Sequence, residues 1–283
     1  MREPRALVPR DLGETLEALA ARDPGLRIVA GGTDVMVEVQ AGSFRGSTLL
    51  DVWRLGELRG IRREGDLLSI GALETYTDLQ RDPLVRDHLP SLVEASATIG
   101  GVQIQNRGTL GGNLANASPA GDSLPVLLAL DAVVECASRG GSRRVPVRDF
   151  FLGYRKTALG ADELLARILV PIPGGERLFF RKIGTRAAQA ISKVVIAGAL
   201  RVEEGRIAGV RLAAGSVAPV PIRLPRTERL LAGRRLDPPL ADAAAASAAS
   251  EVAPIDDVRS TEAYRRAVTG RILRRWLLDL LAA

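Results

Sequence analysis

Residues 98–125 read TIGGVQIQNRGTLGGNLANASPAGDSLP, and this stretch decides how the chain is interpreted. It contains six glycines and three asparagines and shows almost no helical or strand periodicity. Long loops without secondary structure are uncommon inside a compact domain unless they serve a function. We therefore expect 98–125 to be a long functional loop.

Two glycine pairs occur at notable places in the chain. The pair 31–32 follows an expected short strand, and the pair 111–112 lies within the long loop. Glycine has no Cβ and tolerates positive φ, so several backbone N–H groups can approach a diphosphate together. Thr33, Thr109 and Asn113 add neutral side-chain donors. A structural turn explains either pair alone, but both together favour a dinucleotide site that lacks the G-x-G-x-x-G fingerprint.

The composition is that of an ordinary globular chain of 283 residues, with 46% hydrophobic and 25% charged side chains. Cys136 is the only cysteine and His88 the only histidine. The chain by itself therefore cannot form an internal disulfide, a four-cysteine iron–sulfur cluster or a cysteine-based zinc site. Any redox metal must belong to a partner.

The charge pattern argues against a nucleic-acid partner. The net charge of +6 comes from 39 basic and 33 acidic residues that are scattered along the chain, and aromatic residues make up only 4%. A nucleic-acid binder more often shows a basic stripe with stacking aromatics. Residues 1–11 lack the apolar core of a signal peptide, and no run is long enough to span a bilayer. We expect a cytoplasmic protein without a membrane span.

Short helices and strands alternate through the first part of the chain. The expected helices lie near 11–23, 35–39, 91–97 and 123–130. The expected strands and hairpins lie at 27–30, 49–52, 61–73, 133–147 and 164–170. Local hairpins among short elements favour an α+β fold over a doubly wound parallel sheet.

A Pro/Gly cluster at 171–175 marks the expected domain boundary. We predict one domain over 1–173, with subdomains of about 1–56 and 57–173, and a second over 176–283. The second domain is expected to hold strands at 178–183, 194–202 and 206–213, then helices at 226–231, 240–250 and 261–281. The last helix carries an apolar stripe, expected to pack on its own sheet, with a partner surface as the alternative: Tyr264, Val268, Ile272, Trp276 and Leu280.

Few titratable residues are placed for catalysis. His88 lies in 86–90, which is interpreted as a surface turn, and no nucleophile elbow, H-E-x-x-H motif or Walker lysine motif occurs. Asp122 precedes an expected helix, so capping that helix is its simplest role. The alternative role is a hydrogen bond from a ribose or ribityl hydroxyl to the carboxylate.

Seven motifs, in chain order, carry a resemblance that covers essentially the whole chain. They lie at 30–34, 98–101, 103–115, 117–122, 153–157, 180–183 and 188–193. They closely resemble the FAD-binding medium subunit of molybdenum hydroxylases, the family of xanthine dehydrogenase and aerobic carbon monoxide dehydrogenase. Two departures are visible: Thr33 stands where the carbon monoxide enzymes typically have histidine, and Cys136 alone cannot supply the cysteine-rich insertion of benzoyl-CoA-type reductases.

The resemblance implies an α+β FAD-binding unit of the vanillyl-alcohol-oxidase-like (PCMH) type, in which two subdomains clasp the flavin, followed by a smaller α+β domain. By the same likeness, 30–34 and 109–113 hold the pyrophosphate, and Asp122 and Lys182 lie on the flavin. The implied FAD-binding residues are Ala30, Gly31, Gly32, Thr33, Asp34, Ile99, Thr109, Leu110, Gly111, Gly112, Asn113, Asn116, Asp122, Leu165 and Lys182.

The resemblance also implies the role of an oxidoreductase subunit. Electrons would leave a molybdopterin site on a large partner, pass iron–sulfur clusters on a small partner and reach FAD on this chain, in a dimer of heterotrimers with an external acceptor such as NAD. The flavin would do the redox work, so no catalytic side chain is expected here. The alternatives are a self-contained flavin oxidase or reductase, which would need titratable groups beside the flavin, and a flavin-free scaffold, which the intact glycine loops disfavour.

Overall fold

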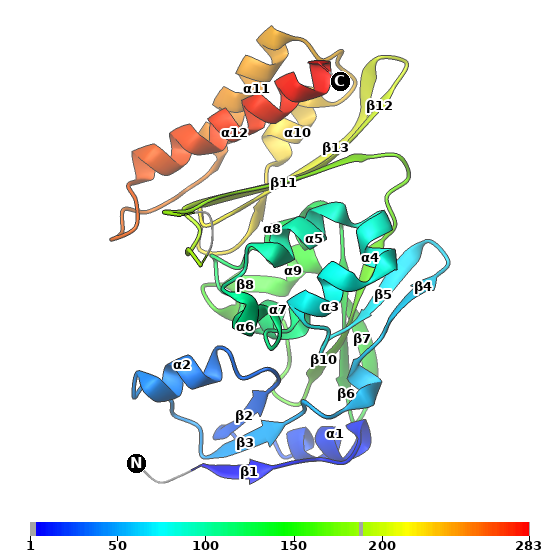
Figure 1. Ribbon diagram of the computed structural model, residues 1–283, viewed down its shortest axis with the longest axis vertical. Helices are drawn as coiled ribbons and strands as arrows, with labels where there is room; N and C mark the ends of the chain where they lie inside the picture. Colours follow the sequence, from blue (N-terminus) through cyan, green and yellow to red (C-terminus); the bar gives the residue numbers. More distant parts are fainter. Residues whose placement is uncertain (1–3, 187–188, 283) are drawn as a thin grey trace.

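The computed structural model describes residues 4–186 and 189–282, arranged as three layers along the long axis of the molecule (Figure 1). A small sheet lies at one end, a five-stranded sheet with its helices lies in the middle, and a four-stranded sheet covered by three helices lies at the other end. The expected mixture of helices and mainly antiparallel strands is confirmed.

The first layer is a parallel sheet with the strand order β1-β3-β2. Its strands are β1 (Arg5–Leu7), β2 (Leu26–Val29) and β3 (Thr48–Asp51), and its helices are α1 (Leu12–Ala20) and α2 (Val35–Gln40). Asp11 caps α1 by accepting a hydrogen bond from the N–H of Glu14 at 2.8 Å, as the sequence predicts. Strand β1 is not expected from the sequence, because three residues are too few to show a period.

The second layer is an antiparallel sheet in the order β4-β5-β10-β6-β7. The hairpin β4 (Ile61–Glu64) and β5 (Leu67–Gly71) and the hairpin β6 (Val133–Ser138) and β7 (Gly141–Pro146) are as expected. Between them lies β10 (Leu164–Pro171), which pairs with β5 and β6. A short hairpin of β8 (Phe151–Gly153) and β9 (Lys156–Thr157) stands apart from this sheet.

Of six helices in the described part of the second layer, the sequence analysis expects only the two near 91–97 and 123–130. The six are η1 (Gly56–Leu58), α3 (Tyr76–Arg81), α4 (Pro83–His88), α5 (Pro90–Ala97), α8 (Ser123–Ala129) and α9 (Val147–Phe150). A capping box begins α3, where Thr75 and Asp78 exchange side-chain hydrogen bonds with each other's backbone N–H. His88 ends α4 and is half-buried, so its assignment to a surface turn is wrong.

The stretch 98–125 is not the single long loop that its sequence predicts. It contains α6 (Val102–Gln105) and α7 (Leu110–Asn116). Both helices are shorter than two and a half turns, so no periodicity can build up, and paired glycines lower the apparent helix propensity of α7 further. Tertiary contacts stabilise these helices instead of local preference.

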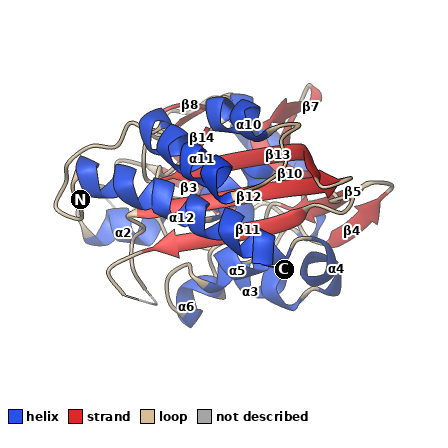
Figure 2. Cartoon of the chain, turned by 90° about the horizontal axis from the view of Figure 1, so that it is seen from above, coloured by secondary structure: helices blue, strands red, loops and turns tan. Residues whose placement is uncertain are grey.

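The third layer is the sheet β11-β12-β13-β14, with all neighbours antiparallel. Its strands are β11 (Arg177–Ile183), β12 (Val194–Glu203), β13 (Arg206–Gly215) and β14 (Ile222–Arg223). Figure 2 shows α10 (Pro225–Leu231), α11 (Pro238–Glu251) and α12 (Glu262–Ala282) lying over this sheet. Its other face packs on α5 and α8 of the second layer.

Strand β12 is buried on both faces and therefore joins two cores. Val195 and Ala197 pack with the second layer, whereas Val194 and Ile196 pack under α11 and α12. This alternation is the period of two expected of a strand. The predicted domain limits at 173 and 176 stay a prediction.

The apolar stripe of α12 packs mainly on its own sheet, as expected. Ile272 and Trp276 are buried, and the Trp276 ring stacks on Phe179 of β11 with 4.7 Å between ring centroids. Tyr264, at the start of the stripe, is instead 43% exposed. None of the described helices is both long and apolar enough to cross a bilayer.

Candidate cofactor site

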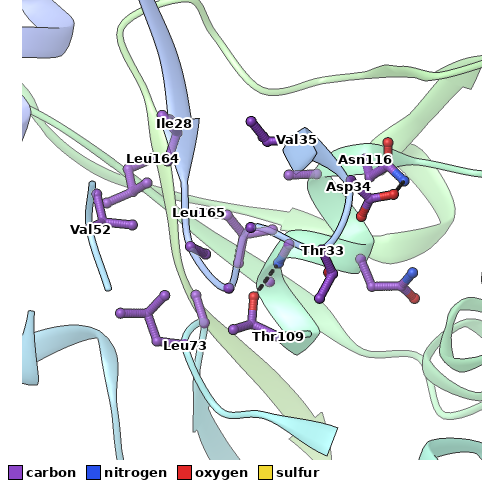
Figure 3. Close-up of a pocket in the computed structure, with 18 of the residues that line it drawn as sticks. Ile28, Thr33, Asp34, Val35, Val52, Leu73, Thr109, Asn116, Leu164 and Leu165 are labelled. Carbon is purple, nitrogen blue, oxygen red and sulfur yellow. Dashed lines mark hydrogen bonds between the residues drawn. The ribbon is translucent and has the colours of Figure 1, made fainter. Parts of the chain in front are cut away.

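A cavity of about 250 Å³ lies where the first and second layers meet α7. One side is polar and is formed by the β2–α2 junction and by α7, and the other side is apolar. Figure 3 shows Thr33, Asp34 and Asn116 on one side of this cavity and Ile28, Val52 and Leu164 on the other. The cavity therefore suits a ligand with one charged or polar part and one flat apolar part.

The loop 30–34 offers unpaired backbone donors to the cavity. Among the described residues, no hydrogen bond is made by the N–H groups of 31–35, and Asp34 makes no capping bond to α2. Gly32 has φ of +79°, a conformation that glycine adopts without strain. Successive free N–H groups at a strand-to-helix turn form a concave site for an anion.

Gly31 allows this loop to touch the stretch 98–125. A Cβ on Gly31 would lie 1.6 Å from the carbonyl oxygen of Arg107. The Arg107 guanidinium stacks on Trp53, with its central carbon 3.8 Å from a ring centroid, and its Nε donates to the Gly31 carbonyl at 3.4 Å. The first glycine of this pair is therefore required for close backbone packing and not for positive φ.

The segment 109–113, which begins α7, has the N–H groups of 110–113 already engaged. Leu110 and Gly111 donate to the carbonyls of Glu74 and Ala72 at 3.0 and 2.9 Å, and Gly112 donates to Thr109 Oγ1 at 3.1 Å. A Cβ on Gly111 would lie 2.6 Å from that of Ala72, so this glycine also serves close packing. Both glycine pairs are expected to present free N–H groups to a diphosphate. For 111–112 this expectation is wrong.

This second loop still offers side-chain donors. Asn113 accepts a hydrogen bond from Ser123 Oγ at 2.7 Å through Oδ1, which leaves its NH₂ group as a donor. Tyr76 also lines the cavity, and burial raises the pKa of its hydroxyl, so that group stays protonated. A protonated hydroxyl can donate to an acceptor in the cavity.

A second polar cluster lies between α8 and the third layer. Lys182 Nζ is 2.6 Å from Asp122 Oδ2 and 2.8 Å from the Thr98 carbonyl oxygen, and both charged side chains are almost wholly buried. Ser192 Oγ donates to the other Asp122 oxygen. Burial raises the pKa of Asp122, whereas the charge and hydrogen bond of Lys182 and the hydroxyl of Ser192 oppose that rise.

Asp122 makes no capping hydrogen bond to α8, so its simplest sequence-based role is wrong. The carboxylate turns instead toward β11, because the buried Lys182 ammonium requires a counter-charge. The motif 188–193 supplies Ser192 to this cluster, and Ala188 lies outside the described residues.

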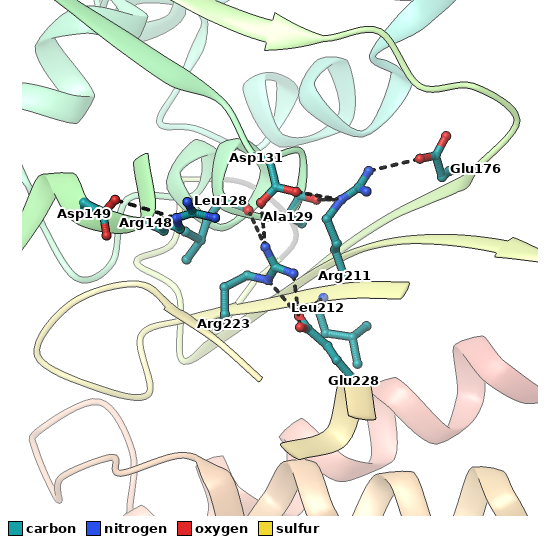
Figure 4. A network of polar contacts seen from close by, with 10 residues as sticks. All are labelled: Leu128, Ala129, Asp131, Arg148, Asp149, Glu176, Arg211, Leu212, Arg223 and Glu228. Atoms are coloured by element: carbon teal, nitrogen blue, oxygen red, sulfur yellow. Dashed lines mark hydrogen bonds and ion pairs between the residues drawn. The ribbon is translucent and has the colours of Figure 1, made fainter. Parts of the chain in front are cut away.

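The other end of α8 is also tied to the third layer, as Figure 4 shows. Arg211 donates to the Ala129 carbonyl at 2.8 Å, and Arg223 pairs with Asp131 at 2.7 Å and with Glu228 at 2.7 Å. Cations at a helix C-terminus interact favourably with the helix dipole. Charged contacts at both ends thus hold α8, and with it Asp122, against the C-terminal sheet.

Most of the predicted binding residues surround the one cavity. Those that line it are Ala30, Gly31, Gly32, Thr33, Asp34, Thr109, Gly111, Gly112, Asn113, Asn116 and Leu165. Asp122 and Lys182 lie in the separate cluster, Leu110 is in the core, and Ile99 packs against that core. Their assignment as FAD ligands stays a prediction.

The sequence analysis misses the apolar side of the cavity and its charged mouth. The missed lining residues include Arg27, Ile28, Glu38, Val52, Leu58, Leu73, Tyr76, Leu159 and Leu164. Apolar residues at strand ends look like ordinary core residues in a sequence, because a cavity wall and a core are built from the same side chains. The only available signal was that Leu164 adjoins the predicted Leu165.

A polar side with free N–H groups beside an apolar recess, on a mixed α+β fold, is a site that suits a nucleotide with a diphosphate. Comparisons with known families agree. Residues 2–173 match the model of the FAD binding domain in molybdopterin dehydrogenase, and residues 179–280 match that of the CO dehydrogenase flavoprotein C-terminal domain.

Individual relatives cover nearly the full chain. The putative xanthine dehydrogenase FAD-binding subunit XdhB of Escherichia coli K12 is 33% identical, over 94% of this chain and 92% of the relative. The structure of carbon monoxide dehydrogenase from Hydrogenophaga pseudoflava superposes with a TM-score of 0.93 at 30% identity, covering 97% and 96% of the two chains. Quinoline 2-oxidoreductase from Pseudomonas putida 86 gives 0.92 at 30% identity, covering 98% and 96%.

The chain therefore belongs to the family of FAD-binding medium subunits of molybdenum hydroxylases, as its motifs indicate. It is an oxidoreductase subunit whose cofactor is FAD. The expected fold, an α+β FAD-binding domain followed by a smaller C-terminal domain, is confirmed.

Proposed function

We propose that this chain binds FAD noncovalently in the cavity and relays electrons from the iron–sulfur clusters of a small partner subunit to an external acceptor. The electrons would originate at a molybdopterin centre on a large partner subunit. The observation that carries the proposal is the two-sided cavity, which is lined by 31–35 with their free N–H groups and by an apolar recess.

We assign the ADP half of FAD to this cavity. The free N–H groups of 31–35, the Asn113 amide and the Tyr76 hydroxyl supply donors for the diphosphate without a lysine. The apolar recess supplies a dry surface for adenine, with Leu165 at its wall. These residues bind and orient the nucleotide, and no proton transfer is asked of them.

The Asp122–Lys182 cluster is the proposed flavin end of the site. FAD, when bound, supplies both one-electron and two-electron redox chemistry. The buried Lys182 ammonium is a cation whose field little water would screen, and Asp122 and Ser192 hold it in place. We infer that the pair orients a polar edge of the ring system and keeps water from it.

The electron route needs partners, because one cysteine and one histidine cannot hold the clusters. Two relatives are a medium subunit of nicotine 6-hydroxylase and a medium chain of carbon monoxide dehydrogenase, and both names imply further subunits. A dimer of heterotrimers and NAD as acceptor are part of this proposal. A cytoplasmic location and the absence of a nucleic-acid partner stay predictions from the sequence.

The alternative is a self-contained flavin oxidase with its own substrate pocket. Such an enzyme needs convergent titratable groups at the flavin. The titratable side chains at the proposed flavin end, Asp122 and Lys182, are paired with each other, and the described lining of the cavity contains neither histidine nor cysteine. The electron-transfer proposal is therefore preferred.

Two measurements test the proposal. Heat-precipitated chain should release free FAD into the supernatant, and the FAD-loaded chain should be reduced by dithionite but should not oxidise purines, aldehydes or N-heterocycles. Adding iron–sulfur and molybdenum subunits should then let such a substrate bleach the flavin without oxygen. Flavin retained on the pellet would contradict noncovalent binding, and turnover by the lone chain at the rate of the complex would replace the proposal with the self-contained oxidase.

A further inference from the structure

The motif 153–157, Gly-Tyr-Arg-Lys-Thr, has no role in the function proposed above. It forms the turn between β8 and β9, and Arg155 occupies that turn with φ of +52°. Left-handed backbone is uncommon for a residue with a long side chain and indicates that the surrounding structure holds it. The turn points the Arg155 side chain at the end of α7, where it meets Asn116.

Arg155, Asn116 and Asp34 form one hydrogen-bonded chain. Arg155 NH1 donates to Asn116 Oδ1 at 2.6 Å, and Asn116 Nδ2 donates to Asp34 Oδ1 at 2.9 Å. Because the Asn116 oxygen accepts from Arg155, its NH₂ group is directed at Asp34. Three segments that are distant in sequence thus meet at the polar side of the cavity, where Figure 3 shows Asp34 and Asn116 side by side.

This hydrogen-bonded chain bears on the negative charges that line the cavity. Asp34 and Glu38 both line the cavity and would repel a diphosphate. Arg27 is the one cationic residue in the described lining, and it is paired with Glu38 at 3.2 Å. Arg155 is the cation whose field acts on Asp34 and opposes the pKa rise that desolvation causes there. Without Arg155, the carboxylate of Asp34 would face the phosphates uncompensated.

We propose that Arg155 is a positioning residue of the diphosphate site: through Asn116 it holds the loop 30–34 against α7, and its charge offsets that of Asp34. The inference rests on the proposed binding of FAD in this cavity. It assigns the 153–157 motif to cofactor affinity and not to electron transfer.

The first test compares FAD affinity of apoprotein variants by flavin fluorescence titration. Arg155→Gln should weaken FAD binding about ten-fold, the size expected for a lost hydrogen bond to a charged group. Arg155→Lys should recover part of that loss because it keeps the charge. Arg201→Gln is the matched control, since Arg201 is an exposed arginine paired with Glu203 at 2.9 Å on the third layer, and it should bind FAD like the wild type.

The second test asks whether Arg155 acts through Asn116. Once Asn116 is removed, Arg155 can contribute only its charge, so Asn116→Ala combined with Arg155→Gln should lose less affinity than the sum of the two single losses. The Arg155→Gln deficit should shrink in 1 M salt, where exposed charges are screened over about 3 Å. The absorbance spectrum and midpoint potential of the flavin that still binds should not change.

The outcomes separate the two proposals. If the wild type binds FAD and Arg155→Gln binds it equally well, or if the two substitutions are fully additive, the positioning role of Arg155 is wrong and FAD binding stands. A shifted flavin potential in Arg155→Gln would also overturn it, because the residue would then act on the ring. If the wild-type chain does not bind FAD, both proposals fail together.

Discussion

Residues 30–34 and residues 109–113 each bring a glycine pair to the same cavity, yet their backbones differ in what they can offer. The N–H groups of 31–35 have no partner among the described residues, whereas those of 110–113 all donate to 72–74 or to Thr109. The backbone of the first segment is therefore free to bind an anion, whereas the backbone of the second is hydrogen-bonded to the core. The two glycine pairs therefore have different roles. The segment 30–34, here called the cradle, offers hydrogen-bond donors, and the segment 109–113, here called the wall, forms a rigid side of the cavity.

The conformations of the paired glycines show why glycine is needed at these positions. Gly31 and Gly111 both lie against backbone, on Arg107 and Ala72, and neither has positive φ. Of the four glycines in the two pairs, only Gly32 has a φ in the left-handed region. Glycine in this site is used chiefly to let chain segments touch, which brings the two loops together at one cavity.

The largest expected effect comes from breaking the contact between the loops. Gly31→Val should weaken FAD binding by about 100-fold or more, because the new Cβ meets a backbone oxygen that cannot move away. Gly111→Val should lose FAD and also about 3 kcal/mol of unfolding free energy, because α7 is part of the core. The flavin-to-protein ratio and urea unfolding measure the two effects.

The matched control for both variants is Gly174→Val. A Cβ at this exposed glycine meets nothing within 4 Å, so the variant should keep its flavin and its stability. If Gly31→Val and Gly111→Val both purify with full FAD, the assignment of the diphosphate to this cavity is wrong. If Gly31→Val unfolds as readily as Gly111→Val, the division into cradle and wall is wrong.

The next effect, chiefly on stability, is expected at the buried pair of Asp122 and Lys182, next to the Ser123 hydroxyl that Asn113 binds. Lys182→Met should cost about 3 kcal/mol of unfolding free energy at pH 7, because it leaves the Asp122 carboxylate buried without a counter-charge. Hydrogen exchange should then rise at 109–113, which Asn113 joins to Ser123 next to Asp122, and should not change at 30–34.

The pH dependence of this variant has a definite sign. The folded protein raises the pKa of Asp122, so the stability linked to its proton is present below the ordinary pKa of about 3.9 and is lost as pH rises through the folded value. Without Lys182 that pKa rises further, so the difference from the wild type should be largest near pH 7 and should shrink toward pH 4. Lys193→Met is the control, because Lys193 is only half-buried and its ammonium lies over the Tyr264 ring, 5.2 Å from the centroid. A pH-independent difference for Lys182→Met, or one equal to that of Lys193→Met, would contradict this account.

The smallest expected effect separates the two threonines of the loops. Thr109→Val removes the hydroxyl that accepts a hydrogen bond from the Gly112 N–H at the start of α7. It should lower the free energy of unfolding by about 1 kcal/mol, or the melting temperature by about 3 °C, and Thr109→Ser should stay close to the wild type. The Thr33 side chain makes no hydrogen bond to another described residue, so Thr33→Val should change FAD affinity and not stability. Equal stability losses for both valine variants would remove the contrast between the loops.

Several elements could be predicted from the sequence because their signals are local. The hairpins β4–β5 and β6–β7 show turn residues between apolar runs, and β12 and α12 are long enough for their periods to be visible. The helices α6 and α7 could not be predicted, since contacts with 72–80 stabilise them. The capping box of Thr75 and Asp78 was a usable signal for α3.

The site itself shows the same division. The residues 30–34 and 109–113 could be predicted to share a site because their residue types are unusual, whereas Ile28, Val52 and Leu73 could not be told from core residues. The capping bond that local sequence favours for Asp122 is not made, because its partner Lys182 is sixty positions away along the chain. Long-range pairing of charges leaves no trace in local sequence.

By itself, the sequence determined the α+β class, the family and FAD as the cofactor, and it predicted that the two glycine pairs share one site, because residue types carry that information directly. Only the tertiary structure decided which N–H groups are free, which carboxylate pairs with which cation, and that Arg155 reaches Asp34 through Asn116. These features depend on distances between segments that are far apart in the chain. Such distances are set when the three layers pack together, and no local pattern encodes them.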